Sequence, residues 1–443
     1  MEQTFMKERK ILPLVLSMSL PMVISMAVNA LYNIVDSYFV AKVSENAMTA
    51  LALVFPVQNL INAVAIGFGI GINAGISLFL GANEGEKANQ AATLGTLFAF
   101  LHGVLLSLVS ILVMPLFLKN FSSDPQTVTL ALTYANRAFL FAPIIAAGLS
   151  FEKIFQAMGK MKITMFCMMC GCITNIILDP LMIFGIGIFP EMGIAGAAYA
   201  TGIGQCVNLA AYLLFYAFGK NPVRLRRNYM RPDAVILKKI YSVGISATLN
   251  LALPSFLISA LNGLLADFSE KYVLVLGVYY KLQTFIYLTA NGIIQGIRPL
   301  MGYNFGAGEH GRVKKIYQTS LAMNVGIMLV GTLLSWAVPA NLIGLFTESA
   351  ETISIGVRAL HIISLGFAVS AVSITCSGAL EGLGKGLPSL LISLARYIVV
   401  ILPAAYLFSR FLDADGVWLA FCFTELVTAV FSAILYRRET QRR

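Results

Sequence analysis

The sequence has 443 residues, of which 58% are hydrophobic and only 12% are charged, and its formal net charge is +10. A soluble chain carries about a quarter charged residues and could not cover this much apolar surface, so an ordinary soluble domain is excluded. The mean hydropathy of +0.81 instead favours a chain that lies within a lipid bilayer.

Twelve apolar segments follow one another along the chain, and each is long enough to cross a bilayer as a helix. A spanning helix needs about 20 residues, whereas the strands of a membrane β-barrel are short and alternate apolar with polar side chains. We therefore predict an all-α polytopic membrane protein with twelve transmembrane helices. The segments lie near residues 11–40, 50–80, 91–118, 129–155, 163–189, 192–218, 237–262, 272–303, 315–344, 354–380, 386–410 and 416–436.

Lysine and arginine are distributed unevenly among the loops that join these segments. With the N-terminus placed in the cytoplasm, 22 of the 31 basic residues fall in cytoplasmic segments and five fall on the opposite face. Cytoplasmic loops are enriched in Lys and Arg, so this bias predicts a multi-pass protein of the inner or plasma membrane with both termini cytoplasmic. The net charge then reports topology, and we expect membrane lipid but no nucleic acid as a partner.

The two halves of the chain match each other at a constant offset of 225 residues. A basic polar stretch separates them, so we predict an N-terminal six-helix lobe over 1–219, a cytoplasmic linker over 220–236 and a C-terminal six-helix lobe over 237–443. Because six is an even number, the two bundles should be parallel and pseudo-symmetric in the membrane. Matching residues include Gly67 and Gly292, Gly71 and Gly296, Glu84 and Glu309, and Lys160 and Lys385.

Three predicted helices of the first half carry polar side chains at helical spacing, so that each set shares one face. Ionisable groups within a bilayer are costly unless they are paired or wetted, so each needs a reason to be there. We predict that the three faces meet around a small water-filled pocket. The sets are Asn29, Asn33 and Asp36 in 11–40, Asn175 and Asp179 in 163–189, and Thr201, Gln205 and Asn208 in 192–218.

Asp36 and Asp179 are the candidate cation-coupling acids, with Asn175 and Thr201 beside them. Two carboxylates in one water-poor pocket repel each other and lose hydration, and a bound proton or cation relieves both effects. Carboxylate, amide and hydroxyl oxygens suit a hard cation, so Asp36 and Asp179 also form a candidate Na⁺ site. The coupling ion, H⁺ or Na⁺, stays open. The alternative is that both acids are neutral or amide-bonded packing elements.

The second half lacks this acid pair, since the positions 225 residues later are Leu261 and Ala404. A polar stripe instead follows segment 272–303, and we predict that it faces the central cavity or the partner lobe. Glu425, near the middle of 416–436, is either a proton or substrate site or an ion-pair partner of Arg396. The candidate cavity residues are Asn33, Gln205, Gln283, Tyr287, Asn291, Gln295 and Arg298.

The sequence carries no signature of enzyme chemistry. It contains no phosphate-binding loop with its lysine, so ATP hydrolysis is not indicated. The glycines of GFGIGINAG (67–75) lie inside a spanning segment and are typical of helix packing. The three histidines are scattered. We therefore expect no enzyme activity and no cofactor other than the coupling ion.

Several motifs resemble those of the multidrug and toxic compound extrusion (MATE) family. They are SLPMVISMAVNALYNIVDSYFV (19–40), GYNFGAGEHGRV (302–313), QAMGKMK (156–162) and EGLGKGLP (381–388). The resemblance covers essentially the full chain and is most similar to the DinF/MepA-like branch. It implies a V-shaped pair of six-helix bundles. By motif, Asp36 resembles the family acid of the first helix, Asn175 with Asp179 the pair in the fifth, and Thr201 the hydroxyl of the sixth.

The resemblance implies an antiporter that exports amphiphilic, often cationic, drugs by alternating access and so contributes to antibiotic resistance. The alternative among transporters is a flippase or exporter of lipid-linked or lipid-like molecules, which would be expected to have extra helices or a strongly basic cavity. Only four basic residues lie within the predicted helices. A membrane-embedded enzyme would need a clustered nucleophile or metal ligands. We expect a monomer.

Overall fold

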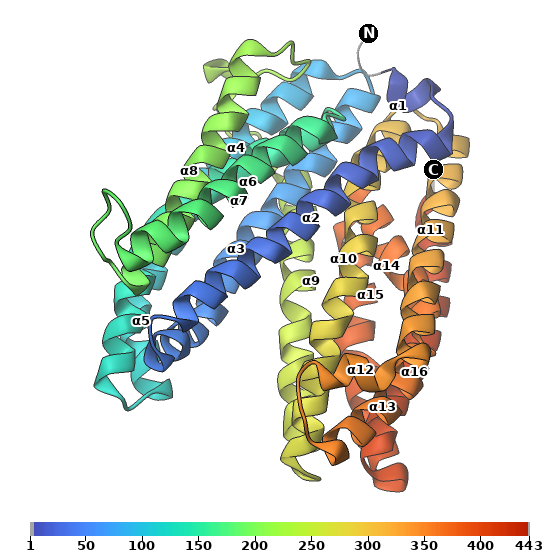
Figure 1. Cartoon of the computed structure of the whole chain (residues 1–443). Helices are drawn as coiled ribbons and strands as arrows, with labels where there is room; N and C mark the ends of the chain where they lie inside the picture. The colour runs from blue at the N-terminus through green and yellow to red at the C-terminus, as the bar shows by residue number, and fades with distance from the viewer. Residues whose placement is uncertain (1–3, 442–443) are drawn as a thin grey trace. The chain divides into compact units, whose positions relative to one another are not determined.

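The computed structural model describes residues 4–441, and every regular element in that range is a helix (Figure 1). Long apolar runs satisfy their backbone hydrogen bonds internally only as helices, which is what a bilayer requires. The elements are α1 (Phe5–Glu8), α2 (Ile11–Ala41), α3 (Glu45–Gly81), α4 (Gly85–Phe121), α5 (Pro125–Ala138), η1 (Phe139–Phe141), α6 (Ala142–Ala157), α7 (Met161–Phe184), α8 (Ile194–Phe218), η2 (Arg227–Tyr229), α9 (Ala234–Ala266), α10 (Glu270–Gly306), α11 (His310–Ala337), α12 (Pro339–Gly344), α13 (Ala350–Ser364), α14 (Phe367–Gly382), α15 (Gly386–Leu394), η3 (Ala395–Val399) and α16 (Ile401–Gln441).

Among the described residues, ten helical segments are long and apolar enough to cross a membrane. An eleventh is formed by α13 and α14, which are bent by 55° at their junction. The segment that ends in α16 holds two helices, because Leu412 and Asp413 break the helical backbone inside it. Twelve spans result, so the prediction of an all-α polytopic fold is confirmed.

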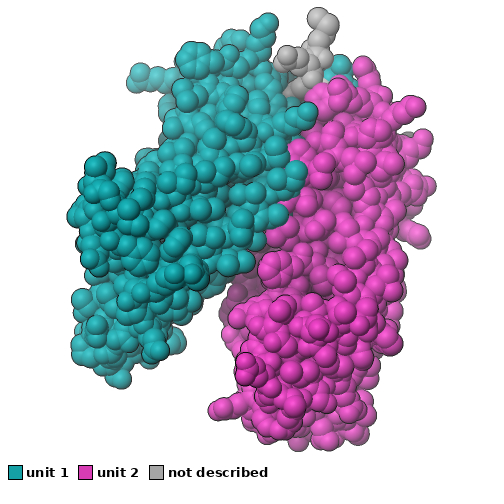
Figure 2. Space-filling model, in the orientation of Figure 1, with its two compact units in different colours: residues 1–4, 24–248 teal, residues 5–23, 249–443 magenta. Residues whose placement is uncertain are grey.

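The chain forms two compact units, coloured separately in Figure 2. Unit 1 contains residues 24–248, and unit 2 contains residues 5–23 and 249–443. Two helices therefore divide between units: the first part of α2 packs within unit 2, and the first part of α9 packs within unit 1. The lobe boundaries at 219 and 237 stay predictions.

The backbone repeats at the offset read from the sequence. Ser44 caps α3 and Ser269, 225 residues later, caps α10. Asp124 caps α5, and its counterpart Ser349 caps α13. A capping side chain satisfies backbone N–H groups that the first helical turn leaves free. The corresponding helix pairs also pack alike, α3 with α4 and α6 in unit 1, and α10 with α11 and α14 in unit 2. Each unit is thus built to one plan.

Small residues set the distance between helices in unit 1. A Cβ placed on Gly71 of α3 would lie 2.2 Å from the backbone oxygen of Ile240 in α9. A Cβ on Gly75, one turn further along α3, would make ordinary contacts at 3.7 Å with Ile240 and 3.9 Å with Ala91. Close helix packing through small residues replaces the hydrophobic force that lipid does not supply.

We expect Gly71→Ala to destabilise the protein by about 1–3 kcal/mol, because the methyl group meets a backbone carbonyl that cannot rotate away. Gly75→Ala is the matched control on the same helix and should change the thermal unfolding midpoint in detergent little. Equal midpoints for the two variants would contradict the close approach of α3 to α9.

Candidate functional site

The polar faces predicted for the first half meet inside unit 1. Helices α7 and α8 pack along each other, and the Asn175 amide on α7 bridges them. Its nitrogen donates to Asp179 Oδ1 over 3.1 Å and to Thr201 Oγ1 over 3.3 Å. Asn175 and Asp179 are one helical turn apart, which places both on the same face of α7. The amide therefore holds the Asp179 carboxyl against α8.

Asp36, on α2, completes this cluster. Its carboxyl and that of Asp179 interact directly as hydrogen-bonding partners. Two carboxyls can hydrogen bond only when one of them carries a proton, because an ionised carboxylate has no donor. Asp179 is fully buried and Asp36 is 9% exposed. The pair is thus a place where a proton is held between two helices.

Several oxygens of the cluster have no hydrogen-bond donor. They are Asp36 Oδ1, Asp179 Oδ2 and Asn175 Oδ1, all buried. Buried polar atoms without partners are rare and call for an explanation such as an ion or water. Carboxylate and amide oxygens are the ligands that hard cations prefer. The residues present therefore fit either a shared proton or a small cation such as Na⁺.

A cavity of about 80 Å³ lies beside the cluster. Its walls include Asn29 and Tyr32 from α2, Asn175 from α7, and Thr201 and Gln205 from α8. Drug-sized molecules occupy pockets of about 300–1,000 Å³, so this space suits water or a small ion and not a drug. The arrangement can take up and release an ion next to Asp36 and Asp179.

The predicted coupling residues Asp36, Asn175, Asp179 and Thr201 thus lie together, and Gln205 lines the adjoining cavity. Asn33 lies elsewhere: its side chain is exposed, and its amide nitrogen donates to the backbone oxygen of Asn29 over 2.7 Å. Its role as a substrate contact stays a prediction, as do the ion-coupling roles of the others.

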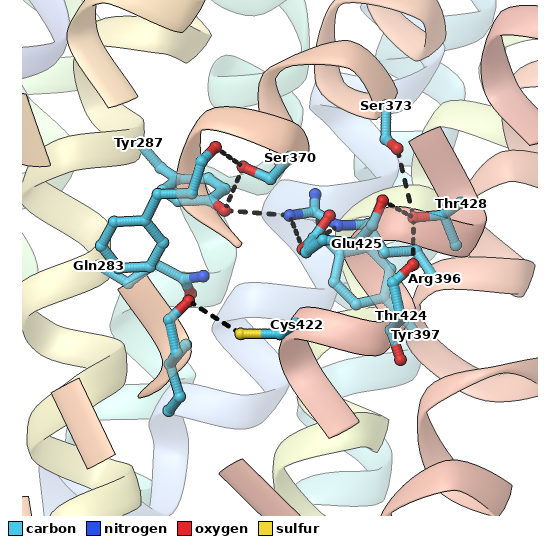
Figure 3. A network of polar contacts seen from close by, with 12 residues as sticks. Gln283, Tyr287, Ser370, Ser373, Arg396, Tyr397, Cys422, Thr424, Glu425 and Thr428 are labelled. Atoms are coloured by element: carbon cyan, nitrogen blue, oxygen red, sulfur yellow. Dashed lines mark hydrogen bonds and ion pairs between the residues drawn. The ribbon is translucent and has the colours of Figure 1, made fainter. Parts of the chain in front are cut away.

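The polar stripe of α10 divides between two networks in unit 2. Tyr287 belongs to the first, shown in Figure 3, where its hydroxyl donates to Ser370 over 2.8 Å and accepts from Arg396 over 3.0 Å. Gln283 lies nearby and donates to the Tyr279 hydroxyl. Arg396 also forms an ion pair of 2.5 Å with Glu425, so of the two interpretations left open for Glu425 its pairing is observed.

Arg298 belongs to the second network. It forms an ion pair of 2.7 Å with Glu381, which also accepts from the Asn250 amide. Asn291 is exposed and Gln295 is partly buried. The five stripe residues therefore do not act as one surface within unit 2.

Sequence reasoning missed a buried charged pair on α6. Glu152 and Lys153 are 4% and 3% exposed and are 2.6 Å apart. The Gln156 amide also donates to Glu152, and Asn73 on α3 donates to the Lys153 backbone oxygen. Glu152 lines the same cavity as Asn175 and Thr201. The available signal was a Glu and a Lys inside an otherwise apolar segment, since such groups need partners in a bilayer.

Comparisons with known proteins agree with this architecture. The model of the MatE family matches residues 21–181 and again residues 247–407. The multidrug export protein MepA of Staphylococcus aureus (strain MSSA476) is 26% identical over 423 residues, which cover 94% of this chain and 91% of that protein. The double match follows the internal repeat.

Two solved structures have a similar fold. One is described as a MOP superfamily transporter from Pyrococcus furiosus, and the other as an outward-facing conformation of a multidrug resistance MATE family transporter. Each aligns with a TM-score of 0.92 at 23% identity and covers 99% of this chain and 98% of its own. At this identity the likeness concerns the fold.

The Glu152–Lys153 pair generates a stability prediction. Lys153→Met should destabilise the protein by about 3–5 kcal/mol, because it leaves a buried carboxylate without its counter-charge. Adding Glu152→Gln to that variant should recover part of the loss, since no uncompensated charge remains.

Thermal unfolding in detergent measures both effects. Lys87→Met is the control, because the Lys87–Glu84 pair is solvent-exposed and such pairs contribute about 0–1 kcal/mol. If Lys87→Met and Lys153→Met lowered the midpoint equally, the buried pair would have no special weight.

Proposed function

Because the chain belongs to the MatE family, we propose that it is a cation-coupled antiporter that exports amphiphilic, often cationic, drugs. The name of the S. aureus relative, a multidrug export protein, supports drugs as the substrate class. The observation that carries the coupling mechanism is the buried contact between the carboxyls of Asp36 and Asp179.

Asp36 and Asp179 come from helices far apart in the sequence, α2 and α7. With a proton or Na⁺ between them the carboxyls attract the shared ion and hold the helices together. Without it the two negative charges repel each other, and at about 4 Å in a protein this amounts to several kcal/mol. Ion occupancy therefore changes the packing of α2 against α7.

Coupling requires only that drug and ion favour different packings. An ion bound at the pair stabilises one arrangement of α2, and a drug that binds the other arrangement better is released when the ion enters. Pro21 within α2 removes one helix hydrogen bond and gives the helix a point at which it can bend. Ion release on the other side of the membrane then restores drug binding.

The positive-inside bias supports cytoplasmic termini, so that ion entry runs inward and drug leaves the cell. The same orientation makes the membrane potential and the ion gradient act in one direction on a single bound cation. We propose this orientation for the inner or plasma membrane.

We expect Asp36→Asn to reduce ion-driven ethidium efflux from proteoliposomes by at least about 100-fold, since about 3 kcal/mol of ion-dependent coupling corresponds to this factor. An amide cannot release a proton or carry the negative charge that attracts Na⁺. Asn33→Ala is the matched control, because Asn33 lies one turn earlier on α2 with an exposed side chain. Normal ion-driven efflux by Asp36→Asn would exclude the proposed site.

The coupling ion can be identified with the same vesicles. A pH gradient and a Na⁺ gradient are imposed separately, each with the other ion equal on both sides. One gradient should drive ethidium against its own concentration, and that response should disappear in Asp179→Asn. Efflux that neither gradient accelerates would rule out cation coupling.

A further inference from the structure

Unit 2 contains a counterpart of the ion-site cavity, and its register can be read from the backbone. Gly193 before α8 and Asp413 inside α16 share an unusual conformation, with φ and ψ of 53° and −133° and of 51° and −142°. Gly196 packs on the Met182 carbonyl, and Gly416, 220 residues later, packs on the Phe408 carbonyl. In these helices the offset is therefore 220 residues.

This register pairs Glu425 of unit 2 with Gln205 of unit 1, a wall residue of the cavity. Helix α7 and its counterpart begin at the earlier offset of 225, set by Gly159 and Gly384, which have φ of 77° and 74°. Arg396 then corresponds to Gly171, which is also a wall residue of the cavity. The ion pair of unit 2 thus joins two positions that face the ion-site cavity in unit 1.

The two positions have opposite properties in the two units. In unit 1, Gly171 has no side chain, and a Cβ there would lie 2.9 Å from the Asn208 Cβ. In unit 2, the Arg396 side chain fills the corresponding space and is 8% exposed. A glycine leaves room for a mobile ion, whereas an arginine places a guanidinium there.

A π-turn accompanies this change. Residues Ala395–Val399 form η3, which begins one residue before Arg396. A π-turn inserts one residue into a helix and is frequent at functional positions. Beyond it the offset is 226, because Phe408 takes the place of Met182, and the counterpart of Asp179 is Ala405 rather than the Ala404 expected from a gapless repeat. The insertion places Arg396 without shifting the rest of the helix.

The surroundings of Arg396 are those of a bound organic cation. The guanidinium lies 5.7 Å from the centre of the Tyr287 ring and 5.4 Å from that of Tyr397, within the range of cation–π attraction. Glu425 Oε1 accepts from Arg396 Nε over 2.9 Å and from Nη2 over 2.5 Å. Figure 3 shows these groups pointing toward one another from α10, η3 and α16. The Glu425 carboxylate is thus neutralised from within the chain.

We propose that Arg396 is a tethered cation that permanently occupies the unit 2 counterpart of the ion site, so that each chain exchanges its coupling ion at one site, in unit 1. The inference rests on the proposed function and names its stoichiometry. Glu425 supplies the anion and Arg396 replaces the mobile cation, because arginine keeps its charge at any physiological pH.

Ion binding to the purified full chain tests the proposal, with radioactive Na⁺ and proton release on ion-free dilution measured in parallel. The wild type should bind one ion per chain, and Glu425→Gln should bind the same number. Asp36→Asn should bind none, and that arm tests the proposed function separately. Loss of an ion on Glu425→Gln alone would overturn the tethered-cation proposal.

Removing the guanidinium supplies the positive test. In the Asp36→Asn background, Arg396→Ala should restore binding of one ion, because the Glu425 carboxylate then lacks its counter-charge, and adding Glu425→Gln should abolish it. Arg396→Lys is the control that keeps a cation and should restore none. If folded Arg396→Ala protein bound no ion in this background, Glu425 would not be an ion site held by Arg396, and the proposal would fail.

The neutral pair Arg396→Met with Glu425→Gln keeps the test decisive if the single variants do not fold. It leaves no uncompensated charge and should bind one ion per chain at the wild-type affinity. A reduced number would show that unit 2 contributes an exchangeable ion.

Discussion

The rest of the site depends on the burial of two carboxyl groups that face each other without a fixed positive charge. Water cannot hydrate Asp36 or Asp179 well, and the Asn175 amide satisfies only one oxygen of Asp179. Such a pair is stable only while a proton or cation lies between its members. Drug export against an ion gradient follows from this requirement, because the occupancy of the pair decides how α2 packs on α7.

Unit 2 solves the same physical problem differently. Glu425 is buried at a related place, but Arg396 pairs with it and two tyrosine rings cover the guanidinium. A charge that is neutralised within the chain has no need of an ion from outside. The duplicated scaffold therefore gives one unit that responds to ions and one whose charges are fixed, which is why an internal repeat need not double the number of coupled ions.

Much of this could be predicted from the sequence, for identifiable reasons. Asp36, Asn175, Asp179 and Thr201 were found because helical spacing fixes which residues share a face and because acids in a bilayer are rare. The repeat was visible because capping residues such as Ser44 and Ser269 are needed wherever a helix starts. Tyr32 was not predicted to line the cavity in place of Asn33, because rotation of a helix by half a turn's error cannot be seen from spacing alone.

Other features depend on tertiary structure. Glu152 and Lys153 are adjacent in the chain, and neighbouring opposite charges are usually exposed at a helix end, so nothing in the sequence required their burial. The counterpart of Glu425 could not be found from a gapless offset. A one-residue π-turn at Arg396 and a shorter loop before Gly416 change the register between the halves.

The central claim is that one site in unit 1 holds the ion that a drug expels. Proton or Na⁺ release on adding ethidium to the detergent-purified protein tests it most directly, because linkage requires each ligand to weaken the other equally. The account predicts release of one ion per chain, with ethidium affinity falling as the ion concentration rises. Tight ethidium binding that releases no ion and is the same at every ion concentration would contradict it.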